Sequence, residues 1–139
     1  MESQVNLSIR VRKVLYPALA AGLVAAAINA VLFWVGSATG AVPADLIIPN
    51  AGQPLTIVPV IISSILPALV AGLVFFLLIR FTRNPLRIFN WVAAIVLILS
   101  FSSPFTIPNV PAGMAVVLEL MHVVVAGSVL IAFNKYVKQ

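Results

Sequence analysis

The sequence predicts an all-α integral membrane protein, a four-helix bundle with up-down-up-down topology and both termini in the cytoplasm. Three observations predict this fold: the composition, four long apolar segments and the placement of the cations. Of the 139 residues, 63% are hydrophobic and only 8% are charged. A soluble domain carries about 25% charged residues. A chain with this composition cannot cover a water-facing surface.

Four segments are long enough to span a bilayer, which takes about 20 mostly apolar helical residues. They are residues 14–35, 55–79, 86–105 and 112–133. Connectors that contain Gly, Pro and Asn separate them, as turns do. We therefore predict one transmembrane domain that occupies residues 1–139.

The cations predict the orientation of the spans. All eight lie before the first span, between the second and third or at the very start of the third, or after the fourth: Arg10, Arg12, Lys13, Arg80, Arg83, Arg87, Lys135 and Lys138. In a chain with four spans these three places share one side, and the connectors on the other side carry only Asp45. Cytoplasmic loops are enriched in Lys and Arg. The predicted location is the plasma (inner) membrane of a bacterium or archaeon, with both termini cytoplasmic.

Composition also argues against several other classes of protein. The net charge of +5 lies in short clusters between apolar runs, and these form no basic face for nucleic acid. Cysteine is absent, which excludes disulfides and thiolate chemistry. A signal peptide is the rival interpretation of the basic start, but the first apolar run is longer than a signal h-region of about 7–15 residues. A first membrane span is therefore favoured.

Small residues predict which helices pack closely, because they let helix backbones approach each other in lipid. They recur at four-residue spacing in the first two spans, as Ala18, Gly22 and Ala26, and as Ser64, Ala68 and Gly72. The two spans also share a similar eight-residue sequence, at residues 17–24 and 67–74. Since these spans run in opposite directions, we interpret the likeness as convergent close packing rather than duplication.

Prolines predict where the spans bend or end. Pro17 is expected in a first helical turn, where proline is well tolerated. Pro59 and Pro67 are expected to bend the second span, and Pro104 to end the third. In the long connector before the second span, residues 46–48 form an apolar patch that we expect at the outer mouth of the bundle or at the membrane interface.

Glu119 and His122 form the one pair of ionisable residues inside a span. They are three residues apart, hence on one helical face, and intramembrane ionisable residues usually point inward and mark functional sites. A rise of 1.5 Å per residue places further polar side chains in the same outer half of the bundle. These are Asn29, Ser63, Ser64 and Ser100. We predict one polar pocket that opens toward the outside and holds a ligand or a proton.

Several alternatives to this pocket stay open. Glu119 and His122 could satisfy each other, Asn29 or a carbonyl freed by Pro67, and lock the bundle without any ligand. The pair is also a weak candidate for metal or haem, but a complete site would need two or more subunits. No nucleophile elbow is present and no second acid stands behind the histidine. We therefore expect no enzyme activity and no cofactor.

Several phrases resemble a family of small bacterial and archaeal four-helix membrane proteins known as a domain of unknown function. They are Arg80-Phe81-Thr82-Arg83 with Pro85 and Phe89, Ser100 with Pro104-Phe105, and Leu118 to Met121-His122 with Ala126. The resemblance covers nearly the whole chain. It implies the same four-helix layout and places His122 in the family's signature stretch, without implying any activity.

Three kinds of function are consistent with these features. The first is an accessory or binding subunit with a polar pocket in the outer half of the bundle. The second is a small transporter or channel that handles a proton, cation or solute through Glu119 and His122. The third is a haem- or metal-binding protein that works as an oligomer. The expected partners are membrane lipids and further subunits, in a homo-oligomer or a larger membrane complex.

Overall fold

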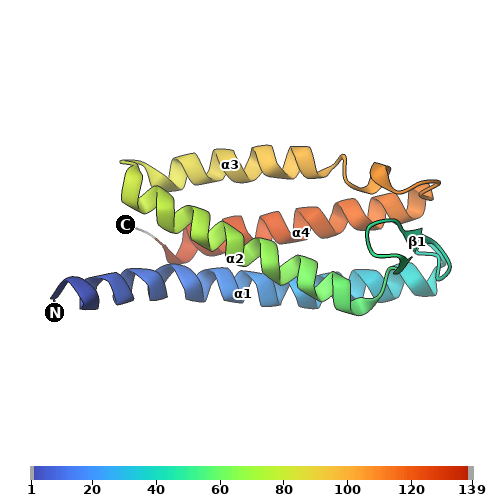
Figure 1. The fold of residues 1–139 in the computed structure, drawn as a ribbon, viewed down its shortest axis with the longest axis horizontal. Coiled ribbons are helices and arrows are strands. Elements are labelled where there is room, and N and C mark those ends of the chain that lie inside the picture. Colours follow the sequence, from blue (N-terminus) through green and yellow to red (C-terminus); the bar gives the residue numbers. More distant parts are fainter. Residues whose placement is uncertain (1, 138–139) are drawn as a thin grey trace.

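A computed structural model describes the backbone of residues 2–137 and the side chains of residues 11–137, and it shows four helices lying side by side (Figure 1). The helices are α1 (Glu2–Ala38), α2 (Ile57–Phe81), α3 (Pro85–Ser100) and α4 (Ala112–Tyr136). A short 3-10 helix, η1 (Pro104–Thr106), precedes α4, and the strands β1 (Ile47–Ile48) and β2 (Gln53–Pro54) pair in the α1–α2 connector. The start of α1 and the end of α4 lie at the same end of the molecule.

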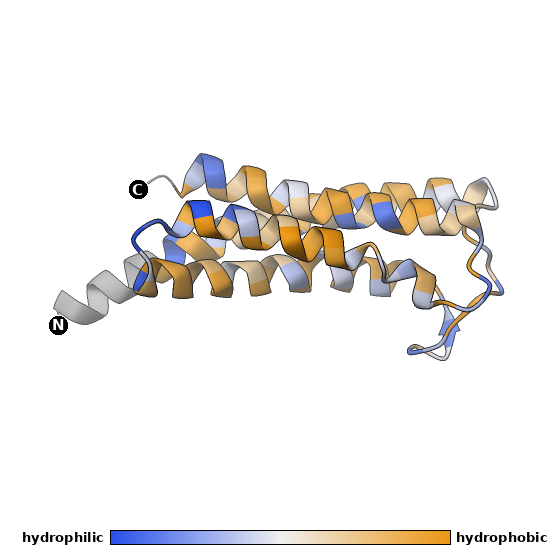
Figure 2. Cartoon of the chain, turned by 90° about the horizontal axis from the view of Figure 1, so that it is seen from above, coloured by the Kyte–Doolittle hydropathy of each residue, from blue (hydrophilic) through white to orange (hydrophobic). Residues whose placement is uncertain are grey.

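All four helical segments are long and apolar enough to cross a membrane, as the sequence predicts. The segments are Val11–Ala38, Ile57–Phe81, Pro85–Thr106 and Ala112–Tyr136. Figure 2 shows hydrophobic residues along most of each helix; hydrophilic residues lie near the helix ends and in the connectors, and a few lie midway along the bundle. The predicted set of four apolar helices, each long enough to span a membrane, is confirmed.

The closest packing is between α1 and α2, where small residues meet. A Cβ added at Gly72 would stand 2.8 Å from the Cβ of Ala18, and one added at Gly22 would stand 3.1 Å from the Cα of Ile65 and 3.2 Å from the Cβ of Ala68. Ala18 touches a residue late in α2 and Gly22 touches earlier ones, so the two helices are antiparallel. The predicted close-packing faces are confirmed.

The third helix is the most loosely held. Only 11% of its apolar segment is buried, against 33%, 28% and 22% for the segments of α1, α2 and α4. The third membrane segment, Pro85–Thr106, ends two residues after Pro104, close to where this proline was expected to end the span. The α-helix itself ends earlier, at Ser100, and Pro104 begins η1. Hydroxyls of Ser100 and Ser102 donate hydrogen bonds to the carbonyls of Leu97 and Leu99. Such local bonds compete with the helix ladder and favour a turn.

Two expectations about prolines, those for Pro17 and Pro59, are wrong. Pro17 lies in the interior of α1, because this helix begins at Glu2 rather than near residue 14. Pro59 lies in the first turn of α2, where a missing N–H costs little, so it does not interrupt the helix. Pro67 is inside α2, as expected.

The buried apolar residues form two clusters at opposite ends of the bundle. The first surrounds Phe75, Phe89 and Phe133, whose ring centroids are 4.8–5.2 Å apart. The second surrounds Val42, Ile107 and Met114 and includes the half-buried Leu46 and Ile48 of the connector, whereas Ile47 is exposed. The predicted apolar patch of the connector therefore covers one end of the core with two of its three side chains.

Candidate functional site

A polar layer separates the two apolar clusters. Along α4, the connector-end cluster stops at Leu118 and the phenylalanine cluster starts at Val129. Glu119 and His122 lie in this interval, and Asn29 and Ser64 lie in the corresponding intervals of α1 and α2. The structure thus places these four of the six predicted candidates at similar levels of the bundle, together with Ser63, the neighbour of Ser64.

Asn29 links three helices within this layer. Its side-chain amide donates to the hydroxyl oxygen of Ser64 at 2.9 Å and to the carbonyl of Met121 at 3.3 Å. Ser64 in turn donates to the carbonyl of Val60 at 2.8 Å. Asn29 is 2% exposed and Ser64 is fully buried. These bonds tie α1 to α2 and α4 in the middle of the apolar bundle.

His122 is held in a fixed orientation by its own helix. Its Nδ1 lies 2.7 Å from the carbonyl oxygen of Leu118. Because a carbonyl only accepts hydrogen bonds, Nδ1 carries the proton, and Nε2 of a neutral ring is left as an acceptor. The ring is partly buried.

Glu119 differs from its neighbours because nothing satisfies its carboxyl group. Both carboxyl oxygens are buried and neither has a hydrogen-bond partner among the described residues; the same is true of Oδ1 of Asn29. The alternative in which Glu119 is satisfied by His122 or by Asn29 is therefore not what the structure shows. Buried polar atoms in folded proteins are almost always paired. These three oxygens can therefore each accept a hydrogen bond from a donor outside the described residues.

Helix geometry assigns Glu119 to the side of α4 that faces α3. Phe133, 14 residues further on, lies about 40° around the helix, and Asn134 lies about 60° around it on the other side. Phe133 packs on Phe89, and Asn134 pairs with Asn90, both on α3. Met121, whose carbonyl binds Asn29, lies about 160° from Glu119. Glu119 and the Asn29 network thus occupy different sides of α4.

The two remaining candidates, Ser63 and Ser100, are not drawn into this layer by hydrogen bonds. The hydroxyl of Ser63 donates to the carbonyl of Val60 at 3.2 Å, and that of Ser100 to the carbonyl of Leu97 at 2.7 Å. Ser63 is exposed on the helix surface and Ser100 is half-buried at the end of α3. Both hydroxyls are satisfied within their own helices.

A reciprocal amide pair between α3 and α4, Asn90 with Asn134, was not predicted from the sequence. Asn90 donates to Asn134 at 3.1 Å, and Asn134 donates back at 2.9 Å and also to the carbonyl of Leu130. The isolated Asn90 between Phe89 and Trp91 is the sequence signal that could have indicated a polar contact between helices. Its partner, 44 residues away, has no local signature.

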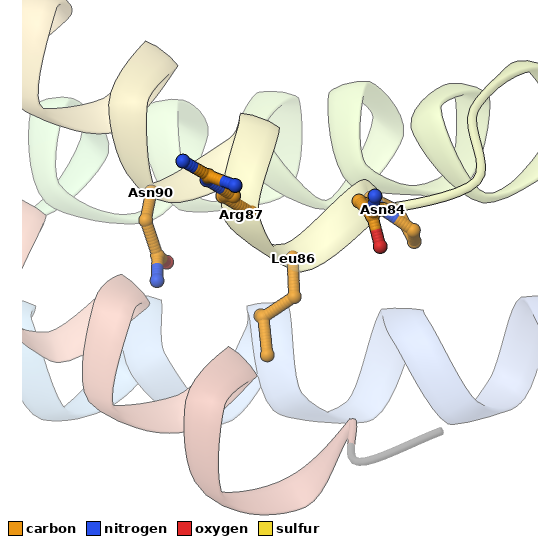
Figure 3. Close-up of a pocket in the computed structure, with 5 residues that line it drawn as sticks. Asn84, Leu86, Arg87 and Asn90 are labelled. Carbon is orange, nitrogen blue, oxygen red and sulfur yellow. The ribbon is translucent and has the colours of Figure 1, made fainter.

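A surface pocket of about 390 Å³ adjoins this amide pair, at the end of the bundle opposite the α1–α2 connector. It is lined by Asn84, Pro85, Leu86, Arg87 and Asn90. In Figure 3, Leu86 and Asn90 point toward α4, whereas Arg87 points away from it. This pocket does not include Glu119 or His122, so it is separate from the predicted polar site.

Within residues 2–137, no group of three or more His, Cys, Asp or Glu side chains could hold a metal ion. Glu119 and His122 therefore do not make a metal site with other residues of the same described chain. The oligomeric metal or haem site stays a prediction.

Four apolar helices that enclose a polar layer define a multi-pass membrane protein. Residues 9–139 match a family described as a family of unknown function, DUF6069, and the chain belongs to this family. The predicted membership of an unknown-function family is thereby confirmed. Comparison with curated proteins and with solved structures gives no match.

Proposed function

We propose that the protein is a binding protein of the plasma membrane, without enzymatic activity, whose site at Glu119 and His122 holds a proton, a small cation or another hydrogen-bond donor. In this proposal the helices run up-down-up-down, the cationic ends and both termini are cytoplasmic, and the site lies in the outer half of the bundle. The cation clusters support this orientation.

The observation that carries the proposal is the unpaired, buried carboxyl group of Glu119. An ionised carboxylate without partners in a bilayer costs several kcal/mol. Ionisable side chains inside membrane spans usually face a partner, a water-filled cavity or a ligand pathway. A proton, a cation or a donor from another molecule relieves this cost, and the neighbouring His122 offers Nε2 as a second polar contact.

Thermal unfolding of the detergent-purified protein tests cation binding, because a cation that binds only the folded state raises Tm with its concentration. A series of Na⁺, K⁺ and choline salts at constant ionic strength is compared for the wild type, Glu119→Gln and the control Asp45→Asn. Asp45 is exposed in the connector. We expect a cation-dependent Tm for the wild type and the control, and none for Glu119→Gln.

Infrared spectroscopy tests the proton form of the proposal. A protonated carboxyl group has a carbonyl band distinct from that of a carboxylate, and the difference between wild type and Glu119→Gln assigns the band to this residue. A wild type that shows neither this band nor any cation effect contradicts both forms.

In the accessory form of the proposal, the donor comes from a helix of another subunit. This form is favoured by the loose packing of the third membrane segment, Pro85–Thr106, which lies on the side of α4 that carries Glu119. Only 11% of the most apolar stretch of this segment is buried. The mass of the complex extracted from membranes in a mild detergent tests it. A partner that is retained by the wild type and lost in Glu119→Gln supports the accessory role, whereas a partner-free monomer excludes it.

A further inference from the structure

A second groove, of about 500 Å³, lies between α1 and α4 at the end of the bundle where α1 carries its cations. It is lined by Arg12, Lys13, Tyr16, Pro17, Ala20 and Tyr136. The groove is remote from the polar layer, since Tyr136 is 17 residues along α4 from Glu119, a distance of about 25 Å. Its residues play no part in the function proposed above.

The groove changes from cationic to apolar along its length. Arg12 and Lys13 lie at the start of the apolar segment of α1. Ala20 lies about 10–12 Å further along the helix. Tyr16 stands between them on α1, and Tyr136 lines the groove from α4; each tyrosine is 65% exposed. Lys135 adds a third cation at the rim, with its Nζ 5.4 Å from the centre of the Tyr136 ring.

No described carboxylate neutralises these cations. The acidic side chains in the described part of the chain are Asp45, in the connector at the opposite end, and Glu119, in the polar layer. Phenol hydroxyls and guanidinium or ammonium groups together suit a phosphate. Basic pockets between transmembrane helices on the cytoplasmic side favour anionic headgroups.

We propose that this groove binds one anionic phospholipid of the cytoplasmic leaflet. Arg12 and Lys13 bind the headgroup phosphate, the hydroxyls of Tyr16 and Tyr136 donate to its ester oxygens, and an acyl chain runs along Ala20. The choice of the cytoplasmic leaflet rests on the orientation proposed above, whereas binding itself does not. Lipid binding and membrane orientation can therefore fail independently.

Native mass spectrometry of the detergent-purified protein tests this site with phosphatidylglycerol and phosphatidylcholine of identical acyl chains. We expect one tightly retained phosphatidylglycerol per chain and weaker binding of phosphatidylcholine. The double variant Arg12→Gln/Lys13→Gln should bind phosphatidylglycerol at least about tenfold more weakly. The matched control, Arg80→Gln/Arg83→Gln, removes the same charge from the α2–α3 end outside the groove and should stay within about twofold of the wild type.

A second variant, Tyr136→Phe, keeps the ring and removes only the hydroxyl. It should bind phosphatidylglycerol severalfold more weakly, because a hydrogen bond to a charged phosphate is lost. Equal binding of the two lipids overturns the proposal. So does an equal loss in the two double variants, which would mean that net charge rather than the groove attracts the lipid.

Discussion

Replacing Gly72 with alanine would place a methyl carbon 2.8 Å from the Cβ of Ala18, and the next nearest atom would be 3.9 Å away in Val14. Real Cβ atoms do not approach that closely, so α1 and α2 must move apart by several tenths of an ångström. Ala18 is fully buried and has no rotamer through which it could yield. Overpacking of this kind costs about 1–3 kcal/mol.

Gly127 provides the matched control, because a Cβ added there meets nothing within 4 Å. Both substitutions replace a helical glycine and gain about 0.5–1 kcal/mol of helix propensity. The difference between the two variants therefore isolates the contact with Ala18. We expect Gly72→Ala to be less stable than Gly127→Ala by about 1–3 kcal/mol.

Reversible unfolding in mixed micelles with increasing SDS, followed by tryptophan fluorescence, measures this difference. The account of the α1–α2 contact is refuted if the two alanine variants have the same free energy of unfolding, or if Gly72→Ala is the more stable one. A further variant, Ala18→Gly combined with Gly72→Ala, restores the space and should recover most of the lost stability.

Three further predictions concern the polar and aromatic contacts and use the same unfolding assay. A double-mutant cycle with Asn90→Leu and Asn134→Leu should give a coupling free energy of about 0.6–1.7 kcal/mol for the reciprocal amide pair; additive effects would contradict it. Phe89→Ala should lower the free energy of unfolding by about 3–5 kcal/mol, because it empties the space beside Phe75 and Phe133. A loss of less than about 1 kcal/mol would argue against a packed cluster of rings. Asn29→Ala should lower the free energy of unfolding by no more than about 1.7 kcal/mol. Its partner Ser64 keeps the hydrogen bond to the carbonyl of Val60, and the substitution also removes the unpaired Oδ1 of Asn29. Complete loss of folding would contradict this reasoning.

The sequence predicted the four membrane segments and the α1–α2 contact because both follow from local composition. Twenty apolar residues have few alternatives to a spanning helix, and small residues four apart mark a close approach wherever they face a partner. Helix ends were predicted less well. Pro17 was expected near a helix start because the apolar run begins there, but α1 continues back through its polar residues to Glu2. Hydropathy locates the membrane segment and not the helix boundary.

The candidate site was predicted only in part, because its contacts depend on how the helices are rotated. Asn29 and Ser64 were expected in one polar region and bond directly. The sequence did not show that the carboxyl group of Glu119 is left without a hydrogen-bond partner among the described residues. The pairing of Asn90 with Asn134 also depends on the register of two helices, which no local pattern specifies.

The orientation of the spans decides which side of the membrane the Glu119 site and the lipid groove face, although binding at either place does not depend on it. Because the chain has no cysteine, single cysteines can be placed at Asp45 and at Arg83, both exposed, and labelled in intact cells with a membrane-impermeant maleimide. The account predicts that Asp45→Cys is labelled at once and that Arg83→Cys is labelled only after the cells are permeabilised. Labelling of Arg83→Cys in intact cells, with Asp45→Cys protected, would contradict it.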